Sequence, residues 1–274
     1  MSKETIQQVH TNKIYNESCL DTMSCMPDNF IDLTVTSPPY DNLRTYNNDI
    51  DKTWGEHIWK PILQELYRVT KEGGVVVWVV GDATIRGSET GTSFKQALYA
   101  MECGFNLHDT MIWTKDQLSF PDKHRYYAAF EYMFVISKGK PKAINLIADK
   151  KNKAYGRKVC DGGERRKDGS MSDKKTGAGN DIKQYGVRYN HWLIYNQSRG
   201  EHNNHPATFP EKLAHDHITS WSNKGDLVYD PFMGSGTTAK MAKFTNRNYI
   251  GSEISEEYVK LAEKRISQMP ETLF

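Results

Sequence analysis

The sequence predicts an α/β fold built on a mostly parallel sheet. Two apolar, β-branched runs, residues 31–35 and 75–80, are typical of buried strands. Between them, residues 54–70 place apolar side chains at helical spacing. A strand, a crossover helix and a strand within about fifty residues form a βαβ unit, which makes the two strands parallel. Residues 226–252 repeat the pattern, with a glycine-containing loop after the first strand.

The N-terminal part supplies most of the predicted sheet. We expect a strand at 13–15, a loop at 16–19, a short helix through Leu20 and Met23, the strand at 31–35, the helix over 54–70, the strand at 75–80 and a helix over 93–102. Gly73 and Gly74 are expected to end the helix that precedes the strand at 75–80. Residues 110–114 and 132–136 are predicted as two strands that pair as an antiparallel edge of the sheet.

Two helices carry further expectations. The helix over 93–102 has its large apolar residues, with Ala97, on one side; these are Phe94, Leu98 and Met101. Near the C-terminus, Pro210 is placed in the first turn of a helix that reaches Trp221.

The C-terminal part closes the predicted sheet. A strand at 226–229, a helix from Thr237 to Phe244 and a strand at 248–252 follow one another. Ser255 is expected to cap a last helix, which carries acidic residues in its first turn.

Charge is distributed unevenly along the chain. The 274 residues carry a formal net charge of +2, but residues 138–200 hold 16 Lys+Arg against 6 Asp+Glu (16 − 6 = +10), which leaves 20 − 28 = −8 elsewhere. A basic segment in an otherwise acidic chain predicts a polyanionic partner such as nucleic acid; a solvated basic loop would have the same composition. Arginines and aromatics interleave in this segment, although Trp192 and Tyr195 are equally well explained as side chains that pack against the domain.

Composition excludes several other classes of protein. No run of about eighteen apolar residues could span a bilayer, and Met1–His10 is too polar for a secretory signal, so we expect a cytoplasmic protein. The four cysteines lack the spacing of a zinc site or of a disulfide framework. The histidines do not suggest a metal site either, and we predict no metal.

A stiff loop follows the first buried strand. Thr36-Ser37-Pro38-Pro39-Tyr40 contains two prolines, which cannot continue a helix or donate to a strand ladder. Ser37 offers a hydroxyl, the residues around the prolines offer carbonyl acceptors, and Tyr40 offers an aromatic face. These groups together could hold a flat ring that carries an amino group, although an ordinary proline-rich turn is the simpler interpretation of the five residues alone.

A second constellation suits a nucleoside. Asp230 ends a strand, Gly234-Ser235-Gly236 leads into a helix, and Glu253 ends the next strand, 253 − 230 = 23 positions later. Such an acid can accept both hydroxyls of a ribose. Thr237 stands where a phosphate-binding loop needs lysine, and the six-residue glycine pattern of nicotinamide sites is incomplete. S-adenosylmethionine (AdoMet) is the common nucleoside ligand that lacks phosphates.

At this point the sequence resembles a family. Residues 230–238 (DPFMGSGTT) look like the cofactor motif of the amino-methylating DNA methyltransferases, residues 36–40 (TSPPY) look like their catalytic motif, and residues 204–210 (NHPATFP) resemble the segment ahead of the cofactor motif. The order of the motifs is similar to that of the family's β class. The resemblance implies a circularly permuted, Rossmann-like AdoMet-dependent methyltransferase fold with a basic insertion. It also implies a bacterial, archaeal or phage origin.

The resemblance also implies a division of the chain and roles for individual residues. Residues 11–137 form the catalytic half, 138–202 a basic target-recognition insertion, and 203–274 the AdoMet-binding half. The implied catalytic residues are Ser37, Pro38, Pro39 and Tyr40. The implied cofactor residues are Asp230, Pro231, Phe232, Gly234, Ser235, Gly236, Thr237, Thr238, Glu253, Glu17, Ser18, Thr36 and Phe209. Related sequences carry an acid where this chain has Ser18, so whether Glu17 or Ser18 serves the adenine is open.

The expected reaction is direct methyl transfer to an amino nitrogen of a flipped base. Ser37 and the Pro38 carbonyl are expected to accept hydrogen bonds from the amino protons while Tyr40 stacks on the ring. In the family that this chain resembles, members with serine before Pro-Pro-Tyr more often methylate N4 of cytosine, and members with aspartate there more often methylate N6 of adenine. Ser37 therefore favours N4 of cytosine, and N6 of adenine is the alternative. A DNA-binding module that keeps the fold without transferring methyl groups is a second alternative. Double-stranded DNA is the expected partner, a cognate restriction endonuclease a further candidate, and the chain is expected to be a monomer or a homodimer. The candidate DNA contacts are Arg44, Tyr46, Arg157, Lys158, Arg165, Arg166, Arg188 and Arg199.

Overall fold

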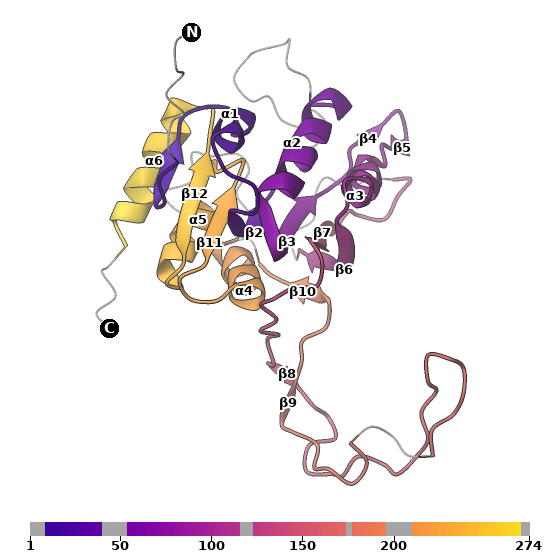
Figure 1. The fold of residues 1–274 in the computed structure, drawn as a ribbon. Coiled ribbons are helices and arrows are strands. Elements are labelled where there is room, and N and C mark those ends of the chain that lie inside the picture. Colours follow the sequence, from indigo (N-terminus) through magenta and orange to yellow (C-terminus); the bar gives the residue numbers. More distant parts are fainter. Residues whose placement is uncertain (1–8, 40–53, 116–122, 174–176, 196–209, 270–274) are drawn as a thin grey trace. The chain divides into compact units, whose positions relative to one another are not determined.

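A computed structural model describes residues 9–39, 54–115, 123–173, 177–195 and 210–269, and it confirms the predicted α/β class (Figure 1). The chain divides into a large unit, residues 1–145 and 190–274, and a small unit, residues 146–189. Four residues of the proposed site, Tyr40, Arg44, Tyr46 and Phe209, together with Arg199, lie outside the described residues.

The large unit is built on an eight-stranded sheet in the order β1-β12-β11-β2-β3-β7-β6-β10. Its strands are β1 (Lys13–Tyr15), β2 (Ile31–Thr36), β3 (Thr70–Val80), β6 (Asn106–Thr114), β7 (Phe130–Ser137), β10 (His191–Leu193), β11 (Leu227–Asp230) and β12 (Asn248–Ser252). All neighbours are parallel except β7, which is antiparallel to both β3 and β6. The predicted antiparallel pair is therefore present, but β10 lies beyond it and forms the edge.

The two ends of the chain meet in this sheet. In Figure 1 the indigo strand β1 lies beside the yellow strand β12, and Ile14 pairs with Gly251 in parallel. The chain leaves β11 towards β12 and leaves β2 towards β3, which are opposite directions across the sheet. The boundary between β11 and β2 is therefore the topological switch point, where open α/β sheets bind ligands beyond the carboxyl ends of their strands.

Helices cover both faces of the sheet. They are α1 (Cys19–Ser24), α2 (Glu56–Val69), α3 (Thr92–Glu102), α4 (Glu211–Trp221), α5 (Thr237–Phe244) and α6 (Glu256–Ser267). Strand β3 shows why two layers form: Val76, Trp78 and Val80 pack with α1, α2 and α3, whereas Val75 and Val77 pack with α4 and α5. This alternation buries the whole run, as predicted for a strand covered on both sides.

Three local predictions need correction. Helix α2 ends at Val69 and β3 begins at Thr70, so Gly73 and Gly74 lie inside the strand, where the pairing with β2 shifts register. Pro210 is the N-cap of α4 and not a residue of its first turn. Ser255 does occupy the N-cap of α6, but its side chain makes no capping hydrogen bond.

The face that α3 turns inwards was also not evident from its pattern. Of the four residues that share one side in the sequence, only Ala97 is buried, while Phe94, Leu98 and Met101 are exposed. The helix packs through small side chains and through Gln96, whose amide oxygen accepts a hydrogen bond from Trp78 Nε1 at 2.7 Å.

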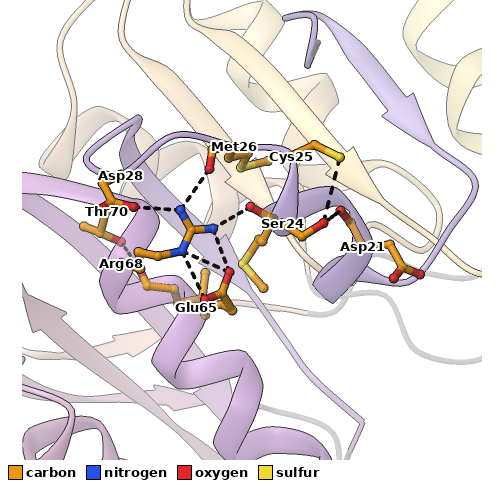
Figure 2. Close-up of polar contacts among 10 residues, drawn as sticks. Asp21, Ser24, Cys25, Met26, Asp28, Glu65, Arg68 and Thr70 are labelled. Carbon is orange, nitrogen blue, oxygen red and sulfur yellow. Dashed lines mark hydrogen bonds and ion pairs between the residues drawn. The ribbon is translucent and has the colours of Figure 1, made fainter. Parts of the chain in front are cut away.

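Arg68 joins α2 to the end of α1 (Figure 2). Its guanidinium donates to the carbonyls of Met23 at 2.6 Å and Met26 at 2.9 Å, and it pairs with Asp28 and Glu65 at 2.8 and 2.7 Å. These carbonyls belong to the last turn of α1 and the loop beyond it, where carbonyls lack helical partners. The side chain thereby fixes the position of α1.

The predicted insertion, residues 138–202, contributes to both units. Within the small unit, β8 (Lys150–Lys151) pairs with β9 (Tyr185–Gly186). Strand β10 belongs to the large unit, where Trp192 is buried in the core. Trp192 therefore follows the packing interpretation rather than that of an exposed aromatic.

Two remaining structural facts concern membranes and cysteines. Within the described part of the chain, no helix is both long and apolar enough to cross a membrane. All four cysteines are free thiols, and burial raises the pKa of Cys19 to about 12.

A short hairpin, β4 (Thr84–Ile85) with β5 (Ser88–Glu89), precedes α3.

Candidate active site

The carboxyl ends of β2 and β11 meet through a hydrogen bond between side chains. Thr36 Oγ1 donates to Asp230 Oδ1 at 2.6 Å. Thr238, in the first turn of α5, donates to the Val35 carbonyl at 3.1 Å and so ties that helix to β2 as well. The strand that leads into Ser37-Pro38-Pro39 and the strand that leads into the glycine loop are thus joined at the switch point.

Asp230 is a buried carboxyl group in this junction. It is 1% exposed, and Oδ1 also accepts from the backbone amide of Phe232 at 3.0 Å. Burial raises its pKa to about 6, and the charge of Glu253 adds to the shift, while the hydrogen bond from Thr36 opposes it. The role of Asp230 within the fold is to shape the loop that follows it.

The loop after Asp230 depends on two glycines. Gly234 and Gly236 have φ values of 51° and 82°, which few other residues adopt readily. A Cβ on Gly236 would lie 2.7 Å from the Cβ of Ala262, so α6 packs directly against the back of the loop. The loop ends at the N-terminus of α5, where backbone amides favour electron-rich ligands.

Glu253 is fixed by the loop on one side and by α6 on the other. Gly234 N donates to Oε2 at 2.8 Å, and Ser255 N donates to Oε1 at 2.9 Å. The second bond satisfies the backbone amide of Ser255, the N-cap residue of α6. Burial raises the pKa of Glu253, although these backbone donors oppose the shift.

The turn between β1 and α1 lies beside Glu253. Glu253 N donates to the Tyr15 carbonyl at 3.0 Å, and Asn16 Nδ2 donates to the Glu253 carbonyl at 2.9 Å. Ser18 caps α1, since its Oγ accepts from Leu20 N at 3.3 Å. Glu17 accepts from Thr22 Oγ1 at 2.9 Å. The Ser18 hydroxyl therefore has a structural role already, and the Glu17 carboxylate is held beside it.

Aromatic side chains surround Phe232, and sequence reasoning did not single them out. Trp54 and Trp78 meet the Phe232 ring edge-on, with centroids 5.6 and 6.2 Å away. A tryptophan at position 78, inside an otherwise aliphatic run at a strand end, was the signal that could have found this cluster.

A network of charged side chains holds the glycine loop from behind, and it was also missed. Arg265 of α6 donates to the Ser235 carbonyl at 2.6 Å and to Ser235 Oγ at 2.7 Å. It pairs with Glu211 of α4 at 3.0 Å, and Lys240 pairs with the same carboxylate at 2.6 Å. Ser235 thus turns its hydroxyl towards α6. Thr237 lies within 3.4 Å of the same guanidinium, and Pro231 is buried.

The residues of the stiff loop follow β2 directly. Pro38 is buried, while Ser37 and Pro39 are half-buried. Asp82, two residues beyond the end of β3, caps the start of α3, since it accepts a hydrogen bond from Ser93 N at 2.9 Å. That bond gives Asp82 a structural role.

The candidate DNA contacts in the small unit differ among themselves. Four of them are exposed, namely Arg157, Lys158, Arg165 and Arg166. Arg188 is not: its guanidinium pairs with Asp149, and its backbone amide donates to the Ile147 carbonyl at 2.9 Å. No cluster of three or more potential metal ligands occurs among the described residues.

Comparisons with known proteins agree with this architecture. The family described as DNA methylase (N6_N4_Mtase) matches residues 31–264. The orphan methyltransferase M.BamHII of Bacillus amyloliquefaciens is 60% identical over 242 residues, which cover 86% of this chain and 88% of that protein. The solved structure of PvuII DNA methyltransferase (cytosine-N4-specific) has a TM-score of 0.68 at 20% identity, covering 97% of this chain and 89% of that one. TTHA0409, a putative DNA modification methylase of Thermus thermophilus solved with S-adenosyl-L-methionine, has a TM-score of 0.61 at 21% identity, covering 95% and 94%.

Proposed function

This chain belongs to the N6/N4 DNA methylase family, and from that premise we propose that it methylates the exocyclic N4 of cytosine in DNA. The coarser activity, AdoMet-dependent methylation of DNA, follows from the family. The observation that carries the assignment of the site is the 2.6 Å bond between Thr36 and Asp230. It joins the strand before Ser37 to the strand before the glycine loop.

The residues around the glycine loop fit AdoMet. The Glu253 carboxylate is held by two backbone amides, so it presents its remaining lone pairs in a fixed direction to the hydroxyls of a ribose. The cations that the structure places at this loop, Arg265 and Lys240, are engaged by Ser235 and Glu211. A nucleoside without phosphates suits this set of donors and acceptors better than a nucleotide does. We assign the ribose to Glu253, and the adenine to Phe232 and Glu17.

We assign the chemistry of the base to the loop after β2. When bound, AdoMet supplies an electrophilic methyl carbon on a sulfonium. The Ser37 hydroxyl and the Pro38 carbonyl accept hydrogen bonds from the amino protons of the flipped base, which orients the nitrogen lone pair. Once methylated, the nitrogen loses one proton to water, because neither acceptor is basic enough to keep it. Tyr40 stacks on the ring. Direct transfer needs no covalent intermediate on the protein.

The choice of cytosine rests on Ser37, and nucleoside analysis tests it. Mixed-sequence DNA is incubated with methyl-labelled AdoMet, digested to nucleosides and separated by mass. We expect N4-methylcytosine; N6-methyladenine would support the adenine alternative and overturn our choice. As a control, Tyr40→Ala should lose turnover but keep AdoMet affinity, which separates a catalytic defect from a folding defect.

An inactive DNA-binding module is the remaining alternative. Equilibrium dialysis with AdoMet distinguishes it, because that module would not retain the cofactor. A cognate restriction endonuclease also stays a candidate partner, but the name of the relative at 60% identity, an orphan methyltransferase, supports action without one.

For the small unit we propose contact with the DNA backbone. Lys150, Lys151 and Lys153 line a cavity of about 620 Å³ together with Tyr189, and Lys150 Nζ lies 4.4 Å from the centre of the Tyr189 ring. Lysines around an aromatic suit phosphate and sugar contacts. Arg188, paired with Asp149, is assigned instead to holding the two ends of this unit together.

Salt dependence of binding tests this division. Log K for a DNA duplex should fall less steeply with log salt in Arg165→Gln/Arg166→Gln, by roughly 0.9 per lost phosphate contact. Arg188→Gln should weaken binding through loss of structure, with a lower melting temperature and little change in slope. An unchanged slope in the double variant would contradict phosphate contact by these two arginines.

A further inference from the structure

The hairpin between β3 and α3 carries an arginine at its tip. Strands β4 and β5 are joined by Arg86 and Gly87 alone. Both of these residues have a positive φ, 50° for Arg86 and 76° for Gly87, which is the pattern of a type I′ turn. The first position of such a turn favours asparagine or aspartate, because longer side chains rarely adopt the left-handed region. Arginine therefore occupies this position at a cost in local stability, which indicates a role other than folding.

The hairpin is tethered by a separate segment of the large unit. The Arg125 guanidinium donates to the Gly87 carbonyl and lies 3.6 Å from the Glu89 carboxylate. The backbone amide of Thr90 donates to the Ala83 carbonyl at 3.0 Å and closes the base of the hairpin. The tip is thus held in place, although each strand is only two residues long.

The sheet places the hairpin at the edge that carries the proposed active site. Trp78 of β3 pairs with Thr36, the last residue of β2, so the carboxyl ends of these two neighbouring strands lie together. Val80 pairs with Tyr132 of the antiparallel strand β7, so residues 123–129, which precede β7, lie at the same edge. A flipped base stays attached to its duplex, and neighbouring strands are only about 4.8 Å apart. A duplex whose base reaches the loop after β2 therefore passes close to the hairpin.

Cations are exposed beside the hairpin, whereas the nearby carboxylates are engaged. Arg86 and Lys123 are exposed, and Tyr126 adds a fully exposed aromatic ring. Cations together with an aromatic side chain suit the phosphates and bases of a nucleic acid. The nearby carboxylates have partners: Asp82 caps α3, Glu89 lies beside Arg125, Glu131 pairs with Lys115, and Glu56 lies between Lys60 and Lys95.

We propose that Arg86 binds a phosphate of the DNA beside the flipped base, with Lys123 and Tyr126 completing the contact. The tethered turn fixes the direction in which the Arg86 side chain leaves the hairpin, so less freedom is lost on binding. Arg125 is a positioning residue, because it holds the carbonyl next to Arg86. The proposal rests on the action of this chain on DNA and does not depend on which base is methylated.

Fluorescence anisotropy with a labelled mixed-sequence duplex, at a series of salt concentrations, tests the proposal. Asparagine suits a positive φ, so Arg86→Asn should keep or raise the melting temperature, while DNA affinity at about 0.1 M salt should fall three- to tenfold. The slope of log K against log salt should become shallower by roughly 0.9, the value for one phosphate contact. Lys264→Gln is the control, since it removes an exposed lysine from the last turn of α6, and it should bind DNA like the wild type.

Methylation of the same DNA separates this surface from the active site. With saturating AdoMet, Arg86→Asn should raise KM for DNA several-fold and leave kcat and the dissociation constant of AdoMet unchanged. Equal DNA affinities of the wild type and Arg86→Asn, or an unchanged salt slope, would overturn the proposal. A wild type that binds the duplex but incorporates no methyl groups would instead contradict the proposed function, and the binding comparison would still decide the role of Arg86.

A double-variant cycle tests the role of Arg125. Arg125→Gln should also weaken DNA binding, because the tip loses its tether. The double variant R86N/R125Q should bind no more weakly than Arg86→Asn alone, since Arg125 acts through the tip. Losses that add in the double variant would overturn the positioning role of Arg125.

Discussion

Asp230 is an acid whose ionisation destabilises the folded protein. The group is 1% exposed, and its pKa is raised from 3.8 to about 6, chiefly by burial. Below pH 3.8 both the folded and the unfolded chain hold the proton, so the ionisation of this carboxyl group does not lower the free energy of unfolding. Between pH 3.8 and about pH 6 the unfolded chain ionises first, so the free energy of unfolding falls as the pH rises through this window.

The magnitude follows from the shift. A raised pKa of about 6 against 3.8 corresponds to about 3 kcal/mol of lost stability above pH 6, at 1.36 kcal/mol per unit. Asp230→Asn keeps an oxygen that can accept from Thr36 and Phe232 but removes the ionisation. The variant should therefore be more stable than the wild type at pH 7 while it binds AdoMet less well.

Urea unfolding at a series of pH values measures this difference. Between pH 5 and pH 7 the wild type should lose about 1.3 kcal/mol relative to Asp230→Asn. Asp21→Asn, at an exposed aspartate of α1, is the control and should follow the wild type. If the stabilities of the wild type and Asp230→Asn run parallel over this range, the reasoning from burial is refuted.

Two further predictions concern the glycine loop. Gly236→Ala should lower the free energy of unfolding by about 2–4 kcal/mol, and Gly225→Ala should lower it by about 1 kcal/mol. Both glycines have a positive φ, but only a Cβ at Gly236 would meet a neighbour, Ala262. Equal losses of stability in urea unfolding would exclude the contact with Ala262 as the cause. Arg265→Met should weaken the binding of AdoMet about tenfold in titration calorimetry and leave kcat at saturation unchanged. Lys260→Met, which removes an exposed ion pair on the same helix, should bind AdoMet like the wild type. Equal affinities of the two variants would show that Arg265 does not support the loop.

The sheet was predictable because its pattern is local. The run Val75–Val80 is apolar at every position, and only a strand buried on both faces explains such a run of β-branched residues before a glycine. Asp230 and Glu253 could likewise be identified from the sequence, because Asp230 ends a strand, Glu253 directly follows the next one, and the glycine loop lies between them. Strand order fixed where these ends would meet, because parallel strands present their carboxyl ends at one edge.

Elements decided by tertiary pairing were not predictable. Strand β10 has three residues in a stretch without periodicity, and it forms because Trp192 pairs with Trp113 of β6 and is buried there. The inward face of α3 was hidden for a related reason. Its large apolar side gave the stronger pattern, but the surface it meets, with Trp78 donating to Gln96, selects the smaller side.

The excess of positive charge along the chain located the small unit, but it could not show which individual cationic side chains are available to contact DNA. Arg68 lies 45 positions from the Met23 carbonyl that it binds, and Arg265 lies 30 positions from Ser235. Arg188, inside the basic segment, pairs with Asp149 across 39 positions. A guanidinium that holds a carbonyl or a carboxylate within the protein has fewer donors left for phosphate. Cations that contact DNA should therefore be sought among exposed side chains such as Arg165 and not by counting charge along the sequence.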